Sequence, residues 1–147
     1  MRGALLLACL LAPAAAMADR PLPAPPPLVK EECGACHVPY SAALLPPESW
    51  ARLMGGLDRH FGTDASVDPR LAKQIADWLA ANAGGKRAQV APPEDRITRA
   101  AWFERKHRKV ASSAWTLPSV KGASNCAACH PGSPQGDFNE RDLRVPR

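Results

Sequence analysis

The chain has 147 residues and a formal net charge of +5, and this length allows one domain or two small ones. Only 5% of the residues are aromatic, which excludes a core built mainly from large rings. The charge is uneven, because residues 91–147 carry ten Lys and Arg against six Asp and Glu, whereas residues 19–90 carry eight of each. This excess indicates docking of an acidic partner or pairing with acidic cofactor groups, and we do not expect nucleic-acid binding.

Residues 1–18 have the pattern of a secretory signal. Met1-Arg2 supplies positive charge, an apolar run follows from Ala4 to Leu11, and Ala16-Met17-Ala18 supplies small residues before a cleavage point. We expect cleavage after Ala18 and a periplasmic mature chain. No later stretch reaches the roughly 20 apolar residues that a membrane helix needs, so we expect no membrane span. Lipid attachment at Cys9 is disfavoured because little apolar sequence precedes it.

A proline-rich lead-in, residues 19–29, separates the signal from the first motif. Its prolines remove backbone donors and favour an extended chain. The sequence Cys33-Gly34-Ala35-Cys36-His37 follows. We predict a short helix that begins near Val29 or Lys30 and is ended by Pro39 soon after the motif.

The next helix is predicted to open at Pro46-Pro47-Glu48, because proline and an acidic residue both suit a first helical turn. Its apolar stripe, at steps of three and four residues, is Trp50, Leu53, Leu57 and His60. This spacing puts His60 on the buried face. The pair Gly55-Gly56 interrupts the pattern, which indicates a bend or a close approach of the backbone to a bound group.

A third helix is predicted from Asp68 as N-cap and Pro69 as first residue, ending at Gly84-Gly85. Its expected buried face is Leu71, Ile75, Trp78, Leu79 and Asn82. We expect this helix to complete a first domain at 30–85. Residues 86–97 mix Gly, Pro and charge without a period and are interpreted as a linker.

The second domain is predicted at 98–147. Thr98 is expected to cap a helix through Val110, with Ala100, Phe103, His107 and Val110 on its apolar face and Arg105, Lys106, Arg108 and Lys109 on the opposite face. The motif then returns as Cys126-Ala127-Ala128-Cys129-His130, with Ser124 or Asn125 as its expected cap. A polar tail, 132–147, is predicted to lack regular structure.

Cys-x-x-Cys-His is the attachment signature of c-type haem, in which two thiols bond to the vinyl groups and the His ligates the iron. We therefore expect Cys33, Cys36, Cys126 and Cys129 to hold two covalent haem c groups, with His37 and His130 as iron ligands. A zinc ribbon is disfavoured because 89 residues separate the two Cys pairs. A thiol redox site is disfavoured because no strand pattern lies nearby.

The mature chain has four His for four axial positions. His60 and His107 are the candidates for the second ligand of the first and second haem, and 23 residues separate each from the motif His of its own half. Pairing within each half is the simplest assignment, although crossed pairing stays open. Each distal His also has an alternative role as an ordinary core residue, and Met54 is the other candidate ligand of the first haem.

The chain resembles the small dihaem cytochrome c family, the DHC type. The resemblance covers residues 30–147 and rests on CGACH followed by Leu44-Leu45-Pro46, on SWARLMGGLDRHFG at 49–62, on RITRAAWF and KHRKV within 96–110, and on NCAACHPGSPQGDFNERDLRVPR at 125–147. It implies a mainly α fold, with a first domain like a class I cytochrome c, a less regular second domain and bis-His iron at both sites. It also implies a membrane cytochrome b as donor and a small oxygen-binding monohaem cytochrome, the sphaeroides haem protein, as acceptor.

These features predict an electron carrier, expected as a monomer. Four His on two irons leave no open coordination position for oxygen or peroxide, which argues against an enzyme. Two alternatives stay open at this point, a dihaem enzyme of peroxidase type and a haem-based gas or redox sensor. Two imidazole ligands also predict low reduction potentials, since a Met ligand is the one that raises the potential.

Overall fold

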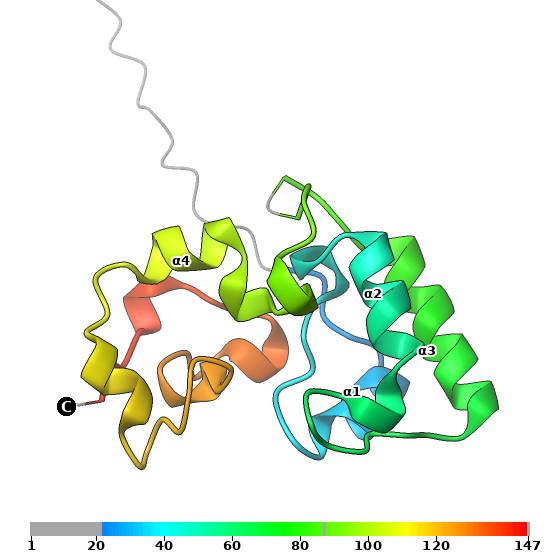
Figure 1. The fold of residues 1–147 in the computed structure, drawn as a ribbon. Coiled ribbons are helices and arrows are strands. Elements are labelled where there is room, and N and C mark those ends of the chain that lie inside the picture. Colours follow the sequence, from blue (N-terminus) through cyan, green and yellow to red (C-terminus); the bar gives the residue numbers. More distant parts are fainter. Residues whose placement is uncertain (1–21, 87, 147) are drawn as a thin grey trace, which may run out of the picture.

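The computed structural model describes residues 22–86 and 88–146. These residues form four α-helices and eight short 3₁₀ turns, and no strand occurs among them. Figure 1 shows α1 (Pro27–Gly34), α2 (Pro47–Met54) and α3 (Pro69–Asn82) on one side, with α4 (Ala101–His107) and the C-terminal residues on the other. The mainly α fold is confirmed. The expected signal, 1–18, lies outside the described residues.

The first core joins α1 to α3. Val29 of α1 and Ile75 and Leu79 of α3 are buried together with Ala42 of a preceding 3₁₀ turn. Partly buried side chains pack against them: Leu28, Cys33, Trp50, Met54 and Trp78. Burial of such side chains is the main stabilising term of a small helical domain. Because Cys33 belongs to this packing, the core fixes the position of the first motif.

The start and end of α3 agree with the sequence. Asp68 Oδ1 accepts hydrogen bonds from the backbone N–H of Arg70 (2.8 Å) and of Leu71 (3.4 Å), so this side chain caps the helix. Gly84, just after the helix, has φ of +81°, a conformation that glycine adopts without strain. Asn82 is wrong as a buried-face residue, since it is exposed at the C-terminal end.

Helices α1 and α2 differ in length from the predictions. Helix α1 begins at Pro27, before the predicted Val29, because proline is well suited to the first helical position. Helix α2 ends at Met54, where Gly55 forms its C-cap. A 3₁₀ turn, Leu57–Arg59, carries the chain onward to His60. The prediction that His60 lies on a continuous helix is therefore wrong.

Helix α4 is shorter than the predicted span from Thr98 to Val110. Ala100 is extended, with φ −69° and ψ 138°, and separates α4 from a 3₁₀ turn at Ile97–Arg99. Thr98 is therefore not the N-cap of α4, a position that Ala100 holds. Beyond α4 the described chain has only 3₁₀ turns, at Ser112–Thr116, Cys126–Ala128, Ser133–Gln135 and Glu140–Asp142. The expected less regular C-terminal half is confirmed, although no side-chain bond caps the second motif.

Two polar contacts join segments that are far apart in the sequence. The Tyr40 hydroxyl donates to the carbonyl of Ser124 at 2.7 Å, which links the residues after the first motif to those before the second. Arg52 of α2 donates two hydrogen bonds to Asp95, from Nε at 2.8 Å and Nη2 at 2.7 Å. None of the described helices is long and apolar enough to cross a bilayer.

Candidate haem-binding sites

The first site gathers around His37. Cys33 lies in the last turn of α1, and Cys36 lies exposed in the turn that follows. The ring centroids of His37 and His60 are 6.3 Å apart, with 28° between the ring planes. His37 Nδ1 donates to the carbonyl of Val38 at 2.8 Å, because a carbonyl can only accept. The other nitrogen, Nε2, is therefore the one available to a metal ion.

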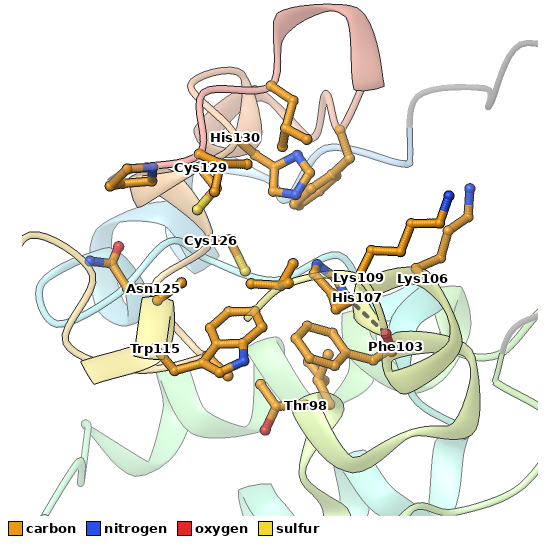
Figure 2. A pocket seen from close by; sticks show the side chains of 18 of the residues that line it. Thr98, Phe103, Lys106, His107, Lys109, Trp115, Asn125, Cys126, Cys129 and His130 are labelled. Carbon is orange, nitrogen blue, oxygen red and sulfur yellow. Dashed lines mark hydrogen bonds between the residues drawn. The ribbon is translucent and has the colours of Figure 1, made fainter. Parts of the chain in front are cut away.

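The second site gathers Cys126, Cys129 and His130 with His107, the last residue of α4. The centroids of His107 and His130 are 6.2 Å apart, and the ring planes are 79° apart. His107 Nδ1 donates to the carbonyl of Phe103 at 2.9 Å, which again leaves Nε2 for a metal ion. All of these side chains line one cavity of about 800 Å³ (Figure 2).

The two spacings have a simple chemical meaning. A metal–imidazole bond is about 2 Å long, and the ring centroid lies about 1 Å beyond the nitrogen, so two imidazoles on opposite sides of one metal ion have centroids about 6 Å apart. Both pairs have this separation. Each pair comes from one half of the chain, so the structure brings together the residues that the sequence paired.

Aromatic rings surround the second site. Phe103 stacks on His107 with centroids 3.9 Å apart, and Trp115 lies 5.9 Å from the same ring. Phe138 lies 5.4 Å from His130 on the other side. Sequence reasoning missed Trp115 and Phe138, because each stands in a segment without a helical or strand period. Together these rings make an apolar enclosure suited to a flat macrocycle.

Burial shifts the pKa of His60, His130 and Cys126 in the two sites. It lowers the pKa of His60, helped by the neighbouring His37, and lowers the pKa of His130, helped by His107. Both shifts favour the neutral imidazole of His60 and of His130, the form that binds a metal ion. Burial also raises the pKa of the Cys126 thiol to about 11. Catalytic thiols have lowered pKa values, so this shift disfavours the thiol redox alternative.

Tyr40 lies between the two sites. Its ring stacks on His37 with centroids 4.8 Å apart, and its hydroxyl reaches Ser124, two residues before Cys126. Tyr40 also lines the second cavity. One side chain therefore contacts the His of the first motif and the chain that leads into the second. No motif or period in the sequence marks Tyr40 for this role.

Two alternatives remain from the sequence, Met54 as a ligand of the first haem and a zinc site at the Cys pairs. Met54 is the last residue of α2 and packs against the first core. Among the described residues, no three His, Cys, Asp or Glu side chains are placed so that they could all bind one metal ion, as a structural zinc site requires. The two Cys pairs instead belong to separate sites.

The second cavity fits a haem by its chemistry as well as its size. Its lining is mainly apolar and includes the rings of Phe103, Trp115 and Phe138, and it also has two cationic side chains, Lys106 and Lys109. Haem c presents an apolar ring with carboxylate acceptors, so the lining suits it. Two helical halves, each with Cys-x-x-Cys-His and a facing His, define the chain as a c-type cytochrome with two haems.

Comparison with known proteins gives the family. The model of the family "Dihaem cytochrome c" matches residues 29–138. The fold is similar to the dihaem cytochrome c from Rhodobacter sphaeroides, with a TM-score of 0.69 and 43% identity over 77% of this chain and 96% of that one. It is also similar to a dihaem cytochrome c from Shewanella baltica OS155, with a TM-score of 0.72 and 32% identity over 82% and 92%. No curated protein sequence matches the chain.

The chain belongs to the dihaem cytochrome c family. Its cofactors are accordingly two covalent c-type haems, and its two Cys-x-x-Cys pairs are Cys33 with Cys36 and Cys126 with Cys129. Membership confirms the resemblance drawn from the motif segments.

Proposed function

We propose that this dihaem cytochrome is an electron carrier in which each iron has two imidazole ligands. His37 and His60 ligate the first haem, and His107 and His130 ligate the second. The observation that supports this best is the centroid separation within each pair, 6.3 Å and 6.2 Å, which is the separation that two imidazoles on one iron require. Cys33, Cys36, Cys126 and Cys129 attach the two rings.

Pairing within each half is favoured over the alternatives. The short centroid separations, 6.3 Å for His37 and His60 and 6.2 Å for His107 and His130, support this pairing. Met54 packs on the core of α1 and α3 instead, which makes it the weaker candidate for the first iron. The Nδ1 bonds of His37 and His107 to backbone carbonyls orient both rings and raise their basicity as ligands.

The haems supply one-electron exchange between ferric and ferrous iron, and the protein sets its conditions. Two imidazoles on each iron leave no position for oxygen or peroxide and favour low reduction potentials. The aromatic rings around His107 and His130 give the second site an apolar lining. Tyr40 provides a packed contact between the two sites, with its ring on His37 and its hydroxyl on Ser124.

The cellular setting follows from the sequence and the family resemblance. A signal at 1–18 would export the chain to the periplasm, where haem c is attached in bacteria. A membrane cytochrome b is the proposed donor, and a small oxygen-binding monohaem cytochrome is the proposed acceptor. A peroxidase or a gas sensor is the alternative function, and each would need an iron that can release one His.

Carbon monoxide binding tests the ligand assignment. The reduced wild type should bind none at neutral pH, because both irons are fully ligated. His60→Ala should open one haem of two, and His107→Ala should open the other. Binding by the wild type would favour the sensor or enzyme alternative. If Met54→Ala opens the first haem and His60→Ala does not, then Met54 is the ligand and His60 is structural.

A further inference from the structure

Two lysines line the second cavity at the end away from its thiols. Lys106 and Lys109 both contribute to the lining. Figure 2 shows them on one side of the line from His107 to His130, with Cys126 and Cys129 on the other side. The cavity therefore has a thiol end and a cationic end, with the two imidazoles between them.

Haem likewise has two chemically different edges. Its two vinyl groups, which become the thioether links, lie at the edge of the ring away from its two propionates. A ring held by Cys126 and Cys129 and ligated by His107 and His130 therefore directs its propionates toward the lysines. We propose that Lys106 and Lys109 bind the propionates of the second haem and thereby raise its reduction potential. The inference rests on the proposed axial ligands.

The other basic residues of this segment have a different position. All four basic residues are exposed, but Arg105 and Arg108 do not line the cavity, whereas the two lysines do. The sequence put all four basic side chains on the face opposite the apolar stripe, as a solvated run, a propionate partner or a docking patch, and in the structure only the two lysines line the cavity. Each pair carries two positive charges, so the arginines are a matched control for the lysines.

Glu140 adds a negative charge at the same rim. Its carboxylate accepts from Lys106 Nζ at 3.0 Å, and it too lines the cavity. A carboxylate here would repel the propionates if it were not paired. Lys106 therefore has two functions, to neutralise Glu140 and to bind a propionate, whereas Lys109 has only the second.

The sign of the effect follows from charge. Reduction adds one electron to the iron, with no bond made or broken, so a nearby positive charge stabilises the reduced form. Removing the two lysine charges should lower the reduction equilibrium constant of the second haem about tenfold, which is a fall of about 59 mV for a one-electron couple. The first haem should keep its potential, because these lysines lie in the other half of the molecule.

The test is a mediated dithionite titration of the holoprotein with spectral separation of the two haems. Lys106→Gln/Lys109→Gln should lower one potential only, while Arg105→Gln/Arg108→Gln should leave both near the wild type. Lys106→Arg/Lys109→Arg should restore the wild-type value. Equal shifts in the lysine and arginine variants, or no shift in either, would overturn the proposal. If the double variant does not fold, Lys109→Gln alone should show a smaller fall in the same potential.

Failure of this inference can be told apart from failure of the axial assignment. If an axial position is open, the wild type itself binds carbon monoxide, and if another side chain is the ligand, His107→Ala leaves the second haem closed. If only the propionate contacts are wrong, the wild type is closed to carbon monoxide and the lysine variants keep both potentials.

Discussion

At the scale of single residues, Tyr40 is the side chain that joins the two halves. Its hydroxyl donates a hydrogen bond to the carbonyl of Ser124, 84 residues further along the sequence, and its ring stacks on His37. Tyr40→Phe keeps the ring and removes the bond, so the free energy of unfolding should fall by about 1 kcal/mol. Tyr40→Leu should cost more, because the ring contact is lost as well. Denaturant unfolding followed by circular dichroism measures both.

Thr116→Val is the control for this prediction. Thr116 also donates a hydroxyl hydrogen bond to a backbone carbonyl, that of Ser113 at 3.0 Å, but the two residues are close in sequence. Loss of the Thr116 hydrogen bond should lower the free energy of unfolding by less than loss of the Tyr40 hydrogen bond. Equal costs for Tyr40→Phe and Thr116→Val would show that the contact between the halves adds nothing beyond a local bond.

Some of the site residues could be predicted from the sequence, and others could not. The Cys pairs and motif His follow from covalent chemistry, which demands a fixed spacing. His60 and His107 follow from apolar stripes that continue to a half-buried position. Tyr40, Trp115 and Phe138 act through contacts with residues distant in the chain, and no local period marks such contacts. Their roles needed the structure.

At the scale of elements, helix α3 owes its start to Asp68. The carboxylate accepts from two backbone N–H groups that would otherwise lack partners. Asp68→Ala should lower the free energy of unfolding by about 1 kcal/mol. Asp77→Ala on the same helix removes a carboxylate paired with Lys73 on the surface and should cost less. Thermal or denaturant unfolding of the two variants checks this, and equal losses would contradict the capping role.

The existence of the helices could be predicted from the sequence, but the residues at which they begin and end could be predicted less well. Pro69 and Gly84 mark α3 because proline and glycine constrain the backbone directly. The stripe through Trp50 and Leu57 continues across Gly55, although the helix does not, because a 3₁₀ turn keeps side chains three apart on one face. His60 therefore reaches the predicted place by a different backbone path. Ala100 gives no such signal, and its extended conformation shortened α4 unexpectedly.

At the scale of the whole molecule, charge bears on partner docking. Arg105 lies in α4 and Arg108 is its C-cap, and both are exposed, which suits approach of an acidic redox partner. The rate of electron transfer to such a partner should fall as salt rises, because charge is screened over about 8 Å at physiological ionic strength. Arg105→Gln/Arg108→Gln should reduce both the rate at low salt and its salt dependence in stopped-flow measurements. A salt dependence equal to that of the wild type would place docking elsewhere.

The central claim is that two complete imidazole pairs ligate two irons, and the ring angles make it measurable. The planes of His37 and His60 are 28° apart, whereas those of His107 and His130 are 79° apart. Nearly parallel imidazoles split the two iron d orbitals that they share, giving a rhombic low-spin ferric signal in electron paramagnetic resonance. Nearly perpendicular imidazoles leave those orbitals close in energy, giving a highly anisotropic signal.

Electron paramagnetic resonance of the oxidised protein therefore tests the claim most directly. The wild type should show one rhombic and one highly anisotropic low-spin signal in equal amounts. His60→Ala should remove the rhombic signal alone, and His107→Ala should remove the anisotropic signal alone. A high-spin signal in the wild type, a near-infrared absorption band of thioether ligation, or loss of both signals in a single variant would contradict the two within-half imidazole pairs.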